Sequence, residues 1–249
     1  MNDLSGKTIL ITGAARRLGR SFALACARAG ADIIIHHGHS PDEADSLREE
    51  IASLGRRAWV LASDFSNPEG ISQFIEQANE LSPLYGLVNS ASIFESLSVH
   101  DTTLDDWNRH LKINLTAPFL LSQAFANQLN AQAAVPGDVK GRIVNILDWR
   151  ALRPGADHFP YTITKSALAA MTKSMAIAFA PNITVNGLAL GAILPPADHS
   201  SAGESIIEAV PAKRWSEAGE AEEALLFLLS GPAYITGEII HLDGGRHLI

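Results

Sequence analysis

Cysteine, long apolar runs and a basic leader are scarce or absent in this chain of 249 residues. The single cysteine, Cys26, has no partner for an internal disulfide, and its apolar neighbours predict a small buried side chain. No apolar run reaches the about 18 residues of a membrane span. Residues 1–7 lack the basic-then-apolar order of a signal peptide. These absences together predict a cytoplasmic protein with no membrane partner.

Positive charge is also in short supply. The chain has 19 Lys and Arg against 27 Asp and Glu, which gives a net charge of −8. Binding to a phosphate backbone depends on clustered cations, so no nucleic-acid partner is expected. No repeat and no internal linker divides the sequence. We therefore expect one domain over residues 1–249.

What the sequence does have is a regular alternation of apolar runs with helical patterns. Unbroken apolar strands that alternate with helices predict a parallel sheet covered on both faces. The fold class is α/β, a doubly wound Rossmann-type sheet of about seven strands. The expected strands are 8–11, 31–35, 58–61, 86–89, 142–147, 183–186 and 238–242. The first expected helix ends at residue 28, and the others cover 41–54, 68–81, 103–130, 159–179 and 221–229.

A glycine turn follows the first expected strand. Gly13 and Gly19 frame this turn, and the first helix starts beside them. Such a turn lets the main chain approach a pyrophosphate, while the helix N-terminus offers free N–H groups. Within the turn, Arg16 is either a phosphate ligand or a solvated side chain, and Arg17 is expected to reach phosphate or substrate. The sequence predicts a dinucleotide site here.

The end of the second expected strand indicates which dinucleotide binds. Enzymes that use NAD place a carboxylate there for the ribose hydroxyl, whereas residues 36–40 read His-His-Gly-His-Ser. Imidazole and hydroxyl groups can donate hydrogen bonds to a 2′-phosphate. We therefore expect NADPH, bound through His37, His39 and Ser40. His36 is either a ligand or a packed strand-end residue. A metal cluster of the three histidines is a minor alternative, and no metal is expected.

Tyr161 and Lys165 form the candidate proton-transfer pair. They are one helical turn apart and so share a face of the expected helix. A phenol is a slow acid at neutral pH, and a nearby ammonium would lower its pKa. Chance spacing is the alternative for such a pair taken alone.

With the glycine turn upstream, these residues resemble the short-chain dehydrogenase/reductase family. Asn89-Ser90-Ala91-Ser92 is similar to that family's Asn-Asn-Ala-Gly, and Asn114 matches its helix asparagine, which anchors a water chain to the lysine. The resemblance implies a homotetramer. It also implies further cofactor contacts, at Leu18, Asp64, Phe65, Asn89, Ser90, Ala91, Tyr161, Lys165 and Gly191.

Asp148 departs from that family, which usually has a serine at this position. An ionised carboxylate cannot donate a hydrogen bond to a carbonyl, and its charge raises the pKa of a neighbouring phenol. Reduction of a simple ketone is therefore disfavoured. Reduction of a C=N bond suits the site better, because an Asp–Tyr pair can relay a proton to ring nitrogen. A degraded, non-catalytic site is the alternative.

With Asp148, the resemblance narrows to pteridine reductases and the related bacterial dihydrofolate and dihydromonapterin reductases. It implies a pterin-like substrate sandwiched between nicotinamide and Phe94, and Phe94 as an ordinary core residue is the alternative. Arg150 and Arg153 suggest an unusual or anionic side group, and Asp157 is expected to cap the following helix. Residues 191–216 are the expected lid. The expected substrate contacts are Arg17, Ser92, Phe94, Asp148 and Tyr161, and the rival functions are a carbonyl or sugar-alcohol oxidoreductase and a silent NADP-binding regulator.

Overall fold

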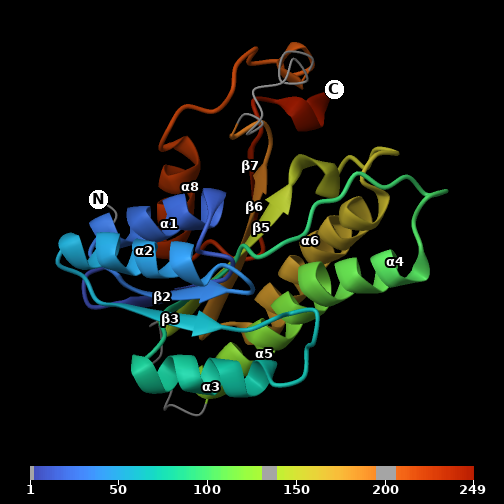
Figure 1. The fold of residues 1–249 in the computed structure, drawn as a ribbon. Helices are drawn as coiled ribbons and strands as arrows, with labels where there is room; N and C mark the ends of the chain where they lie inside the picture. Colours follow the sequence, from blue (N-terminus) through green and yellow to red (C-terminus); the bar gives the residue numbers. More distant parts are fainter. Residues whose placement is uncertain (1–2, 131–138, 195–205) are drawn as a thin grey trace.

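A parallel sheet forms the centre of the computed structural model, which describes residues 3–130, 139–194 and 206–249 (Figure 1). Over these residues the sheet has seven strands in the order β3-β2-β1-β4-β5-β6-β7. The order reverses between β1 and β4, which creates a crevice at the carboxyl ends of the strands. The strands are β1 (Thr8–Ile11), β2 (Asp32–His37), β3 (Ala58–Ala62), β4 (Gly86–Asn89), β5 (Gly141–Asp148), β6 (Ile183–Leu190) and β7 (Ile239–Leu242).

Helices cover both faces of this sheet (Figure 1). One face packs against α1 (Arg17–Arg28), α2 (Pro41–Ser53) and α8 (Glu220–Ser230). The opposite face packs against α3 (Ile71–Leu81), α5 (Ala117–Asn130) and α6 (Phe159–Phe179). The doubly wound fold expected from the sequence is thereby confirmed.

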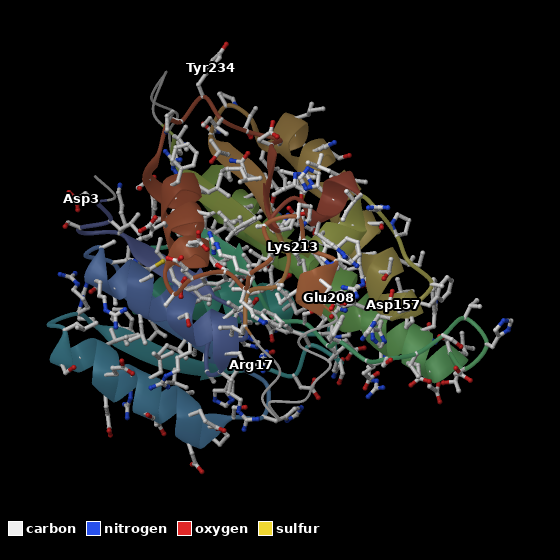
Figure 2. The ribbon with its side chains drawn as sticks, turned by 90° about the horizontal axis from the view of Figure 1, so that it is seen from above. Asp3, Arg17, Asp157, Glu208, Lys213 and Tyr234 are labelled. Atoms are coloured by element: carbon white, nitrogen blue, oxygen red, sulfur yellow. The ribbon has the colours of Figure 1, made fainter. Side chains whose placement is uncertain are left out.

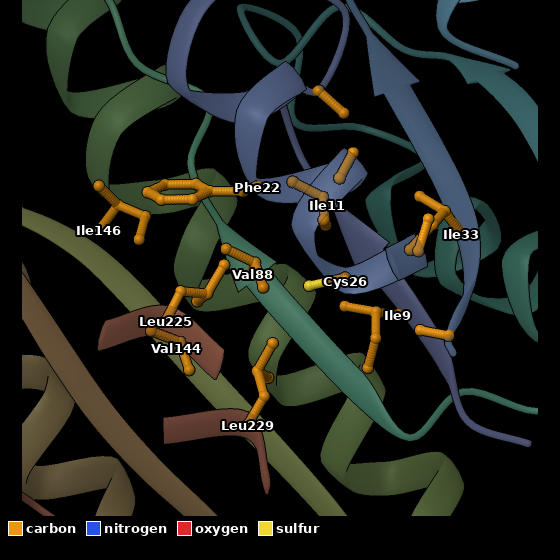
Figure 3. Close-up of a cluster of buried hydrophobic side chains, with 14 of the residues drawn as sticks. Ile9, Ile11, Phe22, Cys26, Ile33, Val88, Val144, Ile146, Leu225 and Leu229 are labelled. Carbon is orange, nitrogen blue, oxygen red and sulfur yellow. The ribbon is translucent and has the colours of Figure 1, made fainter. Parts of the chain in front are cut away.

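The core on the α1 side is built from strand residues that interlock with apolar helix positions (Figure 3). Phe22 and Cys26 of α1 are fully buried among Ile9, Ile11 and residues of neighbouring elements. Burial raises the pKa of the Cys26 thiol to about 12, so Cys26 behaves as an apolar side chain. Its predicted role as a buried hydrophobe is confirmed.

The expected helix over 103–130 consists of three consecutive segments. Helix α4 (Leu104–Leu111) starts at a capping box formed by Thr103 and Asp106. A π-helical turn, Lys112–Thr116, then leads into α5. The wider turn matters because it contains Asn114, and π-bulges are frequent at functional sites.

Some expected boundaries are wrong. The strand expected over 183–186 continues to Leu190. Helix α3 begins at Ile71 rather than at Pro68, because Gly70 adopts a left-handed conformation (φ 91°) and interrupts the helical path. Among the described residues, no helix combines the length and apolar character needed to cross a bilayer. The tetramer stays a prediction. The expected surface loop at 131–140 lies largely outside the described residues, as does the middle of the expected lid.

Candidate active site

A cavity of about 720 Å³ lies in the crevice at the carboxyl ends of the strands. Its wall combines the glycine turn, the ends of β4, β5 and β6, and the start of α6. The structure therefore brings most of the predicted site residues together. Those in the wall are Gly13, Arg16, Arg17, Leu18, Gly19, Ser90, Ala91, Ser92, Phe94, Asp148, Tyr161, Lys165 and Gly191.

Seven predicted residues do not line this cavity: Asn114, His37, His39, Ser40, Asp64, Phe65 and Asn89. The Asn89 side chain is buried and donates to Asn145 Oδ1 (2.8 Å) and Ser122 Oγ (3.2 Å). Its side-chain amide therefore fixes the end of β4 without facing the cavity. A cofactor contact at this position is available only to the main chain, as the family resemblance implies.

The glycine turn is packed so closely that side chains cannot be added to it. A Cβ on Gly19 would lie 2.2 Å from the carbonyl oxygen of Gly13, and one on Gly13 would lie 2.9 Å from Ala91 Cα. The hydroxyl oxygen of Thr12 accepts from the N–H groups of Ser90 and Ala91, both at 2.9 Å. The first helix thus starts directly beside the end of β4, which is the cradle that a pyrophosphate requires.

Arg17 occupies a special place in this turn. Its backbone is left-handed (φ 49°), which is uncommon for a residue with a side chain. Arg17 starts α1, and Figure 2 labels it at the end of that helix. The strained backbone therefore presents an exposed guanidinium at the cavity wall.

His36 has a structural role that the sequence left open. Its Nδ1 accepts from the N–H of Gly13 (3.0 Å), and its Nε2 donates to the carbonyl of Ser63 (2.9 Å). The ring stacks on Phe65 at 4.1 Å. Burial lowers the pKa of His36 to about 4, so the ring is neutral at pH 7. His36 is a packed strand-end residue that holds the glycine turn.

The edge expected to receive a 2′-phosphate carries acidic as well as basic groups. His37 is buried, and its Nδ1 accepts from the N–H of Ser40 (3.3 Å). His39 Nε2 lies 3.5 Å from Asp64 Oδ2, and Arg16 forms an ion pair with Glu43. Among the described residues, no group of three potential ligands could hold a metal ion.

Tyr161 and Asp148 meet in the wall of the cavity. The Tyr161 hydroxyl donates to Asp148 Oδ2 at 3.1 Å. Burial, and then the charge and hydrogen bond of Asp148, raise the pKa of Tyr161 well above its usual value. The net shift is opposite to the lowering expected from Lys165, because burial and the carboxylate dominate it. The phenol keeps its proton at neutral pH.

Lys165 is buried behind this pair. Its Nζ donates to the carbonyl of Ile146 (2.7 Å) and lies 5.6 Å from the centre of the Tyr161 ring. Burial lowers the pKa of Lys165 to about 8, while the charge of Asp148 opposes that shift. The ammonium form still predominates at pH 7, and it faces the site from a main-chain anchor.

Asp148 is itself held by the residues that follow it. Its Oδ1 accepts from the N–H of Arg150 (2.8 Å), and the Arg150 guanidinium lies 3.5 Å away. The same guanidinium pairs with Asp157 at 2.7 Å, and this bond first of all lowers the pKa of Asp157 to about 2. The expected helix cap at Asp157 is wrong. His158 is the N-cap of α6, and Asp157 orients Arg150 instead.

Phe94 stands opposite Tyr161. The two rings meet edge to face at 4.7 Å, and the imidazole of His158 stacks on Phe94 at 4.0 Å. Phe94 is nevertheless 54% exposed, so it belongs to the wall of the cavity and not to the core. The His158 contact links two segments separated in sequence by 64 positions, and no local sequence pattern indicated it.

Asn114 supports the site from the π-helical turn. Its Oδ1 accepts from the N–H of Ile93 (2.9 Å), and its Nδ2 donates to the Ile93 carbonyl (3.0 Å) and Thr164 Oγ1 (3.3 Å). The buried amide is thus fully partnered. It ties the segment before Phe94 to the residue before Lys165.

A Rossmann sheet with a Tyr–Lys pair at this crevice defines a short-chain type of oxidoreductase. The family model described as enoyl-(acyl carrier protein) reductase matches residues 13–247. The chain therefore belongs to the short-chain dehydrogenase/reductase family.

Similar proteins have several activities. The 3-oxoacyl-[acyl-carrier-protein] reductase FabG of Aquifex aeolicus is 34% identical, covering 97% of this chain and 98% of that protein. The 2-dehydro-3-deoxy-D-gluconate 5-dehydrogenase of Bacillus subtilis is 33% identical, covering 98% and 95%. A solved structure of FolM alternative dihydrofolate reductase 1 from Brucella canis, complexed with NADP, is 31% identical with a TM-score of 0.89, covering 100% and 97%.

Proposed function

We propose that this protein is an NADPH-dependent reductase of a pterin, and that it acts on a C=N bond of the ring. The observation that carries the proposal is the hydrogen bond from Tyr161 to Asp148. A serine at that position would donate to a substrate oxygen, whereas the carboxylate offers only acceptors. A nitrogen heterocycle with ring N–H and amino groups is the complementary ligand.

The residues of the cleft suit a bound NADPH. The glycine turn leaves no room for side chains beside Gly13, and His37 to Ser40 lack the carboxylate that would repel a 2′-phosphate. The Brucella neighbour was solved with NADP. Bound NADPH would supply the hydride. The protein's own task is to hold the acceptor and to deliver one proton.

Tyr161 is the group that delivers the proton. Its raised pKa keeps the phenol protonated, so it can protonate the ring nitrogen as hydride reaches the neighbouring carbon. The C=N bond thereby becomes CH–NH, and the phenolate that remains is stabilised by the Lys165 ammonium. Asp148, which touches the same hydroxyl and is partly exposed, then passes a solvent proton to the phenolate.

Phe94 would hold the flat ring in place. Offset stacking on an aromatic face suits a planar heterocycle, and Phe94 is exposed in the cavity wall. Ser92 and Arg17 lie in the same wall and provide a hydroxyl and a guanidinium to the ring edge. The described ends of the expected lid contribute Ile193, Ile206 and Trp215 to the same wall.

Steady-state oxidation of NADPH tests the proposal. Dihydrobiopterin and dihydrofolate should be reduced, with turnover lost in Tyr161→Phe. A ketone panel should include 2-dehydro-3-deoxygluconate, because a sugar-acid dehydrogenase is among the similar proteins. Turnover of ketones alone would establish the carbonyl oxidoreductase. NADPH binding without oxidation by any acceptor would indicate a silent regulator.

A further inference from the structure

Arg246 lies in the wall of the candidate active site, although it comes almost at the end of the chain. It starts a short 3-10 turn, Arg246–Leu248, just after β7. Nothing in its local sequence indicates a site residue. Its position brings a fourth guanidinium to a cavity already lined by Arg16, Arg17 and Arg150.

The indole of Trp149 connects Arg246 to the reacting end of the site. Trp149 directly follows Asp148 and also lines the cavity. Two guanidinium carbons lie near its ring, that of Arg150 at 4.7 Å and that of Arg246 at 4.9 Å. Such contacts place a cation over an aromatic face without neutralising it.

The two arginines differ in their ion pairs. Arg150 is paired with Asp157 and with Asp148. Arg246 has no carboxylate within ion-pair distance in the described part of the chain, and its Nη1 donates instead to the main-chain carbonyl of Ala209. Arg246 thus offers an uncompensated positive charge to the cavity.

The carboxylate of Asp243 is bonded to other partners. Asp243 Oδ1 accepts from the N–H of Gly245 (3.0 Å), and Oδ2 accepts from the main chain and ring of His247 (both 2.8 Å). These bonds shape the turn that presents Arg246. The main-chain carbonyl of Arg246 accepts from Nη1 of Arg153, a further cation (3.4 Å).

We propose that Arg246, backed by Trp149, binds a carboxylate on the side arm of the substrate. The inference rests on the proposed function and makes it narrower, because it favours pterins with an acidic arm, such as folates, over those with a neutral arm. A planar guanidinium fork matches a carboxylate in two parallel hydrogen bonds.

Charge also fixes the direction in which such a substrate lies. Asp148 accepts from ring N–H groups at one end, and Arg246 receives the acidic arm at the other. The reversed orientation would set the arm's carboxylate against Asp148, and like charges disfavour it. The opposite charges of Asp148 and Arg246 therefore select both the arm and the orientation of the ring.

The test compares Arg246→Gln with wild-type enzyme on two substrates. The ratio of kcat/KM for dihydrofolate to that for dihydrobiopterin should fall by about ten- to a hundred-fold, as expected for loss of a charge-assisted pair. Arg246→Lys should recover part of the ratio. Arg28→Gln, which removes an exposed arginine at the C-terminal end of α1, should keep the wild-type ratio.

A purely structural role for Arg246 predicts a different result. In that case its bond to the Ala209 carbonyl positions the main chain around Ala209, and loss of the bond lowers both kcat/KM values equally. An unchanged ratio therefore overturns the proposal. Raised salt gives a second readout, because it should raise the KM for dihydrofolate in the wild type more than in Arg246→Gln.

A binding measurement distinguishes this inference from the proposed function. Calorimetry with p-aminobenzoyl-glutamate uses the acidic arm without any pterin ring, so it needs no turnover. Binding to the wild type that weakens in Arg246→Gln supports the anion site even if no pterin is reduced. Equal affinity in both proteins, or no binding to either, counts against it.

Discussion

The hydroxyl of Tyr161 donates to Asp148 Oδ2 at 3.1 Å, while the amine of Lys165 donates elsewhere, to the Ile146 carbonyl. The phenol therefore has an acceptor as its immediate partner, and the cation stands behind it. Burial and the carboxylate raise the pKa of Tyr161, which makes it a proton donor in the resting site.

Replacing Asp148 with serine should change both the substrate and the pH profile. The carboxylate raises the pKa of Tyr161, so its removal lowers that pKa. Activity that requires the protonated phenol is lost as pH rises through this pKa, and the alkaline limb should move to lower pH. We expect pterin kcat/KM to fall at least ten-fold, and ketone turnover to become measurable.

Asp148→Asn provides the matched control for shape. It keeps the size of the side chain but removes its charge, so the alkaline limb should shift as in the serine variant. Pterin turnover that survives unchanged in both variants would contradict the proposed role of Asp148.

Lys165→Met should change how stability depends on pH. The pKa of Lys165 is about 8 in the folded protein and about 10.5 in the unfolded chain. Between these values the unfolded state binds the extra proton, so this lysine makes the wild type gain stability as pH rises from 8 to 10.5. The unfolding free energy of the wild type minus that of Lys165→Met should therefore increase as pH rises over that window.

Denaturant unfolding at several pH values measures this difference, and titrations common to both proteins cancel. Below about pH 8 the difference should be flat. A slope of opposite sign, or none at all, would show that the amine is not desolvated in the folded state.

His36→Phe should loosen the glycine turn, because the N–H of Gly13 then has no ring nitrogen to accept it. NADPH should bind several-fold more weakly. The pKa of His36 falls from 6.5 to about 4 on folding. Between these pH values the unfolded chain binds a proton on His36 and the folded protein does not. Relative to the variant, the wild type should lose stability as pH falls from 6.5 towards 4.

Titration of NADPH by fluorescence and unfolding at pH 7, 6 and 5 examine the two effects separately. A wild type and variant that lose stability in parallel over this range would mean that the imidazole is free to protonate.

Gly19→Ala should abolish tight cofactor binding. The added methyl would lie 2.2 Å from the Gly13 carbonyl oxygen, so the turn must open. We expect at least a ten-fold rise in the Kd for NADPH, and a loss of about 1–3 kcal/mol in unfolding free energy, as for other overpacked sites.

Gly55→Ala is the control, because Gly55 has a positive φ of 75° but open space around it. Its cost is backbone strain alone, about 1 kcal/mol. Calorimetric titration should give the wild-type Kd for this variant. If both alanine variants bound NADPH normally, the close approach of Gly19 would not matter for the cofactor.

The sheet and its helices were predictable because their signals are local and repeated. The inner strands of the parallel sheet are buried on both faces and so are mostly apolar runs, as in Ile33 to Ile35. Boundaries were less certain where one residue decides them. At α3 the positive φ of Gly70 outweighs the preference of Pro68 for a first turn.

The site was predictable in its identities but not in its energetics. Spacing alone places Tyr161 and Lys165 on one helical face, but it does not show that the lysine donates to a carbonyl. The stacking of His158 on Phe94 and of Arg246 on Trp149 joins distant segments. Such contacts depend on how loops fold over the sheet, and no periodic pattern encodes them.

The spacing of two side chains on α6 matches the spacing of their two partners on β5. Tyr161 and Lys165 are four residues apart, a rise of about 6 Å along a helix. Their partners Asp148 and Ile146 are two residues apart, about 6.6 Å along a strand. The two spacings agree, so both bonds form in one alignment of helix on strand. Sliding the helix by a single turn would break both contacts at once, and the chemistry would be lost as a unit.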